Sequence, residues 1–110
     1  MCDGCVCISD IALSAVVNIK ATALSSSSIL VTWQDAAHHN SSTSVIAYSV
    51  HFFPSSARHQ EVQRVVTMSN DTLRSLRPDT EYVIYVTAYA YEGKSEPSQH
   101  VTARTYAEGT

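Results

Sequence analysis

The sequence predicts an all-β domain, a β-sandwich of two sheets with seven antiparallel strands. The 110 residues are 45% hydrophobic and 15% charged, which suits a single domain with one apolar core. Short segments alternate apolar and polar side chains with a period of two, and clusters rich in serine, aspartate or proline separate them. No segment has a convincing helical period, and two stacked sheets are the natural way to bury seven half-apolar strands.

The first two strands are predicted on either side of a four-serine turn, Ser25–Ser28. Residues 17–22 alternate between apolar and polar side chains, and residues 29–33 do the same. Serine favours turns because its hydroxyl can bond to nearby backbone groups. The alternation in the second strand places Trp33, the single tryptophan, on the buried face.

The middle of the sequence predicts three more strands, over residues 45–53, 60–67 and 68–73. The first of these ends at Pro54, because proline cannot donate a hydrogen bond to a β-ladder. A polar loop is predicted before it, over residues 35–44. The alternation in the third strand places four apolar residues on one face, namely Ile46, Tyr48, Val50 and Phe52.

The strongest strand pattern covers residues 81–91. One face of this strand carries Tyr82, Ile84, Val86 and Ala88, and the other carries Val83, Tyr85, Thr87 and Tyr89. A turn is predicted over residues 92–97, and residues 99–105 form the last strand. The odd number of strands predicts that the chain enters and leaves at opposite ends of the sandwich.

The segment before the long strand resembles a known family. Leu76-Arg77-Pro78-Asp79-Thr80-Glu81-Tyr82 reads L-x-P-x-T-x-Y, which is similar to the turn before strand F of fibronectin type III domains. The resemblance implies that Leu76 closes the core edge, that Pro78 fixes the turn, and that the Tyr82 hydroxyl reaches a backbone group upstream. The buried positions of the second and sixth strands hold no cysteine, which disfavours the disulfide-linked immunoglobulin class.

The resemblance covers residues 15–106 and implies fibronectin type III topology, with a structural core that includes Trp33, Tyr48, Leu76, Pro78 and Tyr82. The chain resembles repeats of immunoglobulin-superfamily cell-surface receptors, such as the neogenin/DCC group, protogenin, Sidekick and the receptor tyrosine phosphatases. This implies a non-catalytic adhesion or receptor module on the extracellular face of the plasma membrane, within a single-pass membrane protein. Its partners would be another protein and the neighbouring domains of its own chain. A passive spacer and an accessory module of a secreted enzyme remain alternatives.

Catalytic chemistry has little support in the sequence. Neither G-x-S-x-G nor H-E-x-x-H occurs, and the three glycines are too far apart to form a phosphate-binding loop. The net charge of −3 gives no basic field for nucleic acid. We therefore expect no enzymatic activity, no cofactor, no metal and no nucleic-acid partner.

The outward side of the long strand and its neighbours is the candidate binding surface. Strand alternation groups five side chains there, namely Tyr85, Tyr89, Phe53, Val83 and His51. His100 is expected to flank them on the last strand. Exposed aromatic side chains gathered in one patch are favoured at protein interfaces. The alternative is that these cross-strand pairs only stabilise the surface of the sheet.

Positive charges and two sequons give weaker candidate sites. If the fourth and fifth strands pair, Arg64 and Arg74 approach each other and could bind a sulfated glycosaminoglycan, although a solvated face is the commoner role of such charges. Asn40 and Asn70 each begin a sequon and could accept an N-linked glycan if the chain enters the secretory pathway.

Both ends of the chain are predicted to lie outside the domain. Residues 1–14 are expected to be a flexible leader, and residues 107–110 a C-terminal linker. The leader contains all three cysteines, Cys2, Cys5 and Cys7. A structural zinc site needs four ligands, and the fourth is missing nearby. A metal site or a disulfide in the leader remains the alternative.

Overall fold

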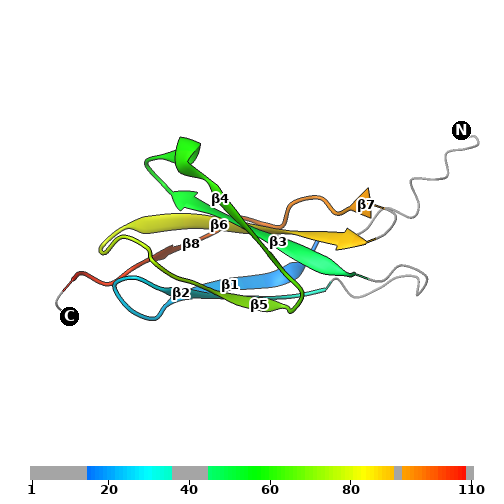
Figure 1. Cartoon of the computed structure of the whole chain (residues 1–110), viewed down its shortest axis with the longest axis horizontal. Helices are drawn as coiled ribbons and strands as arrows, with labels where there is room; N and C mark the ends of the chain where they lie inside the picture. The colour runs from blue at the N-terminus through cyan, green and yellow to red at the C-terminus, as the bar shows by residue number, and fades with distance from the viewer. Residues whose placement is uncertain (1–14, 36–44, 91–92, 109–110) are drawn as a thin grey trace, which may run out of the picture.

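The computed structural model describes residues 15–35, 45–90 and 93–108 and shows two antiparallel sheets packed face to face (Figure 1). The three-stranded sheet has the order β1 (Val17–Ala23), β2 (Ile29–Gln34), β5 (Asn70–Leu73). The five-stranded sheet has the order β4 (Val62–Val66), β3 (Ala47–Pro54), β6 (Glu81–Ala90), with β7 (Gly93–Lys94) and β8 (Val101–Arg104) both paired to β6. The predicted all-β sandwich is confirmed.

The core lies between the sheets and follows the alternation of the central strands. On β2, Ile29 and Val31 are fully buried and Trp33 is 3% exposed. On β6 the four inward residues of the sequence pattern are all buried, namely Tyr82, Ile84, Val86 and Ala88. Eight residue pairs join β3 to β6 without a break in register. Because successive side chains point to opposite faces of a strand, this register also fixes which residues lie on the outer surface.

Strand boundaries differ from the sequence expectations in the middle of the chain. The fourth and fifth strands are shorter than predicted, because the 3-10 turn η2 (Arg58–Gln60) precedes β4 and a turn separates β4 from β5. The described residues contain eight strands rather than seven, since β7 lies where only a turn was predicted. Ile46 precedes β3 and is 46% exposed, whereas Tyr48, Val50 and Phe52, which were predicted to share its face, are buried.

Two serines hold the irregular segment between β7 and β8 against β6. The Oγ atoms of Ser95 and Ser98 accept the backbone N–H groups of Ala88 and Val86, each at 2.9 Å. The backbone N–H of each serine donates to the carbonyl of the same β6 residue at 2.8 Å. The hydroxyls therefore replace the carbonyl groups that a regular neighbouring strand would supply.

The turn before β6 contains the predicted tyrosine corner. The Tyr82 hydroxyl accepts the backbone N–H of Arg77 at 3.0 Å, and Leu76 is buried beside it. Pro78 is exposed, so it belongs to the turn and not to the core. Ser75 and Asp79 have left-handed backbones, with φ of 60° and 48°, which lets the turn reverse within a few residues.

A second buried tyrosine closes the core near the N-terminal end of β3. Tyr48 packs edge-on against Trp33, with ring centroids 5.3 Å apart, and its hydroxyl donates to Asp35 Oδ1 at 2.6 Å. Burial, and then the bond to Asp35, raise the pKa of Tyr48 far above its usual value. The predicted core positions of Trp33 and Tyr48 are confirmed.

The first and last described residues lie at opposite ends of the sandwich (Figure 1). The predicted cysteine-containing leader at residues 1–14, the part of the predicted loop that contains Asn40 (residues 36–44), and residues 91–92 and 109–110 lie outside the described residues.

Candidate functional site

Three aromatic rings stack across the outer face of the five-stranded sheet. His51 on β3 lies opposite Tyr85 on β6, and their rings are parallel within 1° at a centroid distance of 4.4 Å. His100, just before β8, stacks on Tyr85 at 4.5 Å with an angle of 24°. We call these three residues the aromatic stack. The sheet register brings them together from three separate parts of the chain.

A carboxylate anchors the stack. Glu61 Oε2 accepts the Tyr85 hydroxyl at 2.9 Å and lies 3.1 Å from His51 Nδ1. Partial burial and then the hydrogen bond to Glu61 raise the pKa of Tyr85. Glu61 follows η2 directly, so this turn positions the carboxylate over the sheet. The rings are therefore held in one arrangement by contacts within the domain.

Not all residues of the predicted binding surface are exposed in the structure. Val83 and Tyr89 are half-buried on the same outer face as Tyr85. Phe53 is only 4% exposed, so the expectation that it is exposed there is wrong. The guanidinium of Arg58 lies 5.3 Å from the centroid of the Phe53 ring. Phe53 is covered because η2 folds back over this corner of the sheet.

Two further members of this surface were missed from the sequence. Glu61 was absent from the predicted site because nothing in the local pattern shows that it reaches across to β6. Val65 on β4 lies opposite Ser49, shares the outer face, and is 67% exposed. Val65 could have been predicted, because strand alternation places it on the outer face once the register of β3 and β4 is known.

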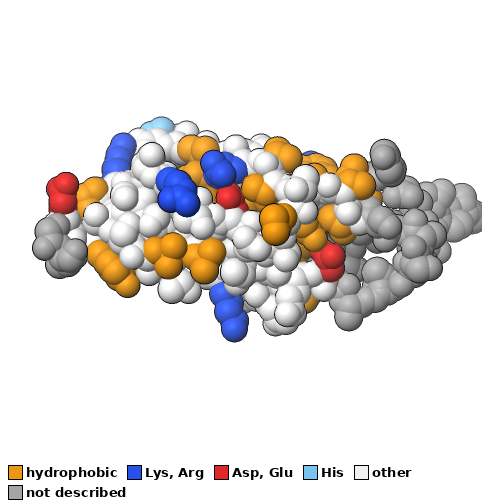
Figure 2. Space-filling model, turned by 60° about the horizontal axis from the view of Figure 1, so that its bottom comes forward, with side chains coloured by type: hydrophobic (Ala, Val, Ile, Leu, Met, Phe, Trp, Pro, Cys, Tyr) orange, Lys and Arg blue, Asp and Glu red, His pale blue; other side chains and the backbone are white. Residues whose placement is uncertain are grey.

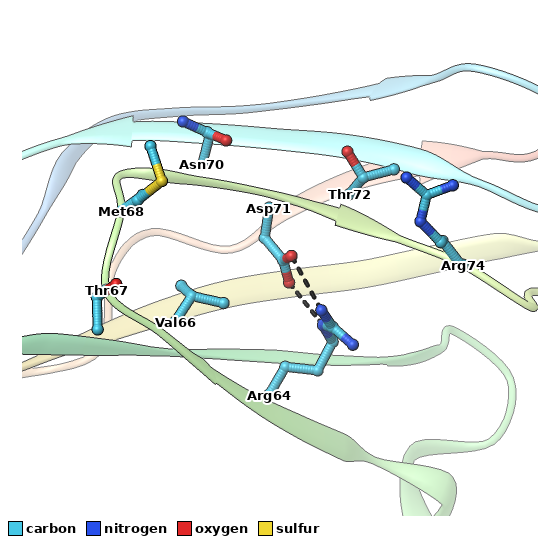
Figure 3. Close-up of a pocket in the computed structure, with 8 residues that line it drawn as sticks. All are labelled: Arg64, Val66, Thr67, Met68, Asn70, Asp71, Thr72 and Arg74. Carbon is cyan, nitrogen blue, oxygen red and sulfur yellow. Dashed lines mark hydrogen bonds and ion pairs between the residues drawn. The ribbon is translucent and has the colours of Figure 1, made fainter.

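The predicted arginine pair does not form as expected. Strands β4 and β5 belong to different sheets and do not pair with each other. Arg64 reaches from β4 across the open edge of the sandwich and makes two hydrogen bonds to Asp71 on β5, at 2.7 and 3.2 Å (Figure 3). This bond, together with the charge of Asp71, raises the pKa of Arg64. The charge of Arg64 is therefore paired with Asp71, although Arg64 and Arg74 line the same hollow, so the glycosaminoglycan site stays a prediction.

The edge between β4 and β5 forms an open hollow of about 490 Å³. Its lining includes Arg64, Asp71, Arg74, Met68 and Asn70. Figure 2 shows this side of the molecule, where hydrophobic side chains form separate groups and basic and acidic side chains lie together near the middle. This view shows no single continuous apolar surface. The ordered aromatic stack lies elsewhere, on the outer face of the five-stranded sheet.

Among the described residues, no group of three or more histidine, cysteine, aspartate or glutamate side chains is placed to hold a metal ion. The same part of the chain contains no helix long and apolar enough to cross a membrane.

The sequence profile of the fibronectin type III domain matches residues 14–104. The chain belongs to the fibronectin type III family. The fold supports this assignment through the sheet order and the tyrosine corner at Tyr82.

Curated relatives are much longer than this domain. Protogenin of Rattus norvegicus is 40% identical over 96 residues, covering 84% of this chain and 8% of the relative. Protogenin of Homo sapiens is 38% identical over the same length. Receptor-type tyrosine-protein phosphatase F of Homo sapiens is 31% identical over 88 residues, covering 80% of this chain and 5% of the relative. The chain therefore spans a small part of each of these proteins.

Solved structures show the same fold. A structure described as a myokine has a TM-score of 0.71 and 26% identity, and the match covers 86% of this chain and 99% of that one. The FN1–FN3 domains of chicken CNTN1 give 0.72 and 26%, covering 86% and 32%. The fn3 domain of human collagen alpha-1(XX) gives 0.76, with 90% of each chain covered, and at 24% identity it supports the fold alone.

Proposed function

We propose that this domain is an extracellular module of a cell-surface receptor and that the outer face of its five-stranded sheet binds another protein. The aromatic stack is the observation that carries this proposal. The relatives support the location, because they belong to receptor families that the sequence resembles. The domain proper would occupy residues 15–106, between a leader at residues 1–14 and a linker at residues 107–110.

The geometry of the stack favours recognition because its rings are already ordered. Ordering a free side chain at an interface costs about 0.5–1.5 kcal/mol. Tyr85 is held between two histidines and bonded to Glu61, so little of this cost remains. Val65 adds an exposed apolar contact on the same face, and the histidine and glutamate edges offer polar contacts.

The second candidate function is a spacer that only orients its neighbours. The placement of the first and last described residues at opposite ends of the sandwich favours this role (Figure 1). A spacer needs no partner on its outer face, and the aromatic stack would then serve only to stabilise the sheet. The two functions differ in whether replacing surface side chains of the stack changes binding.

A screen against receptor ectodomains tests the proposal. The 110-residue chain, multimerised on a carrier, is applied to an array of cell-surface ectodomains. We expect at least one specific binder. The double variant Tyr85→Ser/Tyr89→Ser should weaken that binding by about thirtyfold or more, which corresponds to a hot spot of about 2 kcal/mol.

Two further variants separate binding from folding. Val65→Asp places a charge on the same face without touching the stack, so it should also weaken binding while thermal stability is kept. Tyr106→Ser removes a tyrosine that is 50% exposed outside this face, beside the turn after β1, and should leave binding unchanged. If no ectodomain binds, or the double variant binds as well as the unmodified chain, the spacer function is favoured instead.

A further inference from the structure

We propose that Asn70 carries an N-linked glycan that covers the open edge between β4 and β5. This inference rests on the proposed extracellular location, because the transferase acts in the secretory pathway. The donor is a lipid-pyrophosphate-linked oligosaccharide. A bond forms between Asn70 Nδ2 and the sugar C1, the bond from C1 to the pyrophosphate oxygen breaks with its electron pair on that oxygen, and the amide proton passes to a base.

The strand geometry suits the acceptor motif Asn70-Asp71-Thr72. Asn70 and Thr72 point to one side of β5, and Asp71 points to the other side, toward Arg64 (Figure 3). Asn70 is exposed at the start of the strand, opposite Thr32 on β2. Asp71, the middle residue of the motif, therefore contacts Arg64 at the edge of the sandwich, while the Asn70 amide remains on the outer surface.

A comparison with Asn18 indicates that a sugar on the Asn70 amide would displace no side-chain contact in the described part of the folded domain. The Asn18 Nδ2 donates to Gln34 Oε1 at 2.7 Å, and Asn18 begins no sequon. The Asn70 side-chain amide makes no hydrogen bond to the part of the chain that the structure describes. Replacing one of its protons by a sugar therefore breaks no contact there.

A glycan at this position would protect a vulnerable part of the fold. Strand β5 is the edge of the three-stranded sheet and β4 is the edge of the five-stranded sheet. Edge strands present unpaired backbone groups, and proteins commonly cover or charge them to prevent aggregation. Met68 is 65% exposed in the turn between these strands and lines the same hollow as Asn70. The first sugars would lie over Met68 and the edge, away from the aromatic stack.

Secretion from cultured animal cells tests the proposal. The 110-residue chain is expressed behind a secretion signal, and glycan sites are mapped by peptide mass spectrometry after enzymatic release, which converts the modified asparagine to aspartate. We expect modification at Asn70 in the folded protein. The variants Asn70→Gln and Thr72→Ala should lose it, and Thr72→Ser should keep it, because serine also completes the motif.

A second readout tests the covering of the edge. Hydrogen peroxide oxidises exposed methionine to the sulfoxide. We expect Met68 in the glycosylated chain to oxidise at least about twofold more slowly than Met68 in Asn70→Gln, since the sugars restrict access. Equal rates would overturn the covering role.

The modification itself is overturned if the secreted chain is unmodified at Asn70. An unmodified Asn70 beside a modified Asn40 overturns it equally, and also shows that the transferase met the chain. The secretion signal forces this route, so these results do not depend on the receptor role. The receptor role fails separately, through an empty ectodomain screen.

Discussion

Two tyrosines three residues apart on β6 show how one strand serves both the core and the surface. Tyr82 points inward, is 5% exposed, and its hydroxyl accepts a backbone N–H group. Tyr85 points outward, is half-buried, and its hydroxyl donates to a carboxylate that belongs to the surface. Both rings have aromatic neighbours, since Phe52 packs edge-on against Tyr82 and two histidines stack on Tyr85.

The difference follows from position in the strand and not from residue type. An odd spacing on a β-strand places two side chains on opposite faces. The inward tyrosine is buried and accepts a backbone N–H group in a partly buried place, so the fold depends on it. The outward tyrosine is bonded only to other surface side chains. It can therefore change during evolution, or contact a partner, at little cost to the fold.

The largest effect is expected from removing the two rings. Tyr82→Ala should lower the free energy of unfolding by about 3–5 kcal/mol, because a large buried side chain leaves a cavity. Tyr85→Ala should lower it by less than about 2 kcal/mol, the sum of two cross-strand ring pairs. Urea denaturation of both variants measures the difference. Equal losses of unfolding free energy would contradict the distinction between the inward and the outward tyrosine.

Ser95 and Ser98, which lie beside β6, extend the comparison, because their hydroxyls also bond to backbone groups. Ser98→Ala should cost about 1–3 kcal/mol, since the Val86 N–H group loses its acceptor in a buried place. Ser56→Ala, at an exposed turn position after β3, is the matched control and should change stability by less than about 0.5 kcal/mol. A neutral Ser98→Ala would show that another group replaces the hydroxyl.

High pH provides a test of the core tyrosine at the other end of the sheet. The folded protein holds Tyr48 neutral, with its pKa raised by burial and by Asp35. The unfolded chain releases this proton near pH 10. The stabilisation is thus complete below about pH 10 and declines above it, as the unfolded chain alone loses the proton.

Tyr48→Phe should therefore flatten the fall of unfolding free energy above about pH 10. Urea titrations at several alkaline pH values measure this slope. Tyr85 contributes in the same direction, because its pKa is also raised. A slope that is identical in Tyr48→Phe and the unmodified chain would contradict the assignment.

The smallest effect is expected at the β4–β5 edge. Arg64 is 48% exposed and Asp71 only 9%, measured on their side chains. A double-mutant cycle with Arg64→Ala and Asp71→Ala should give a coupling of about 1 kcal/mol or less, because solvent screens the pair. The coupling should shrink at high salt. A coupling that is larger, or independent of salt, would show that the ion pair is part of the core and not of the surface.

The sequence predicted the fold well where a regular pattern set it. The alternation on β6 placed eight side chains on two faces, and the run from Leu76 to Tyr82 predicted the corner that the structure confirms. These features depend on local spacing, which a single sequence contains. The prediction that Pro78 lies in the core failed because a turn residue can fix the backbone while remaining exposed.

The candidate site was only partly predictable because its members meet through tertiary contacts. Phe53 has the correct parity for the outer face, but the η2 turn covers it with Arg58. Glu61 reaches Tyr85 from 24 residues away, which no local pattern indicates. The pairing of Arg64 with Asp71 depends on β4 and β5 belonging to different sheets. Strand alternation alone does not determine that topology.

The hydroxyl of Tyr82 stabilises the fold, whereas the hydroxyl of Tyr85 only bonds to another surface side chain and contributes little to stability. The most direct measurement is the unfolding free energy of Tyr82→Phe and Tyr85→Phe in the same buffer. We predict a loss of about 1–3 kcal/mol for Tyr82→Phe, because the Arg77 N–H group loses its acceptor. We predict a change within about 0.5 kcal/mol for Tyr85→Phe. Equal losses, or a larger loss for Tyr85→Phe, would contradict the account.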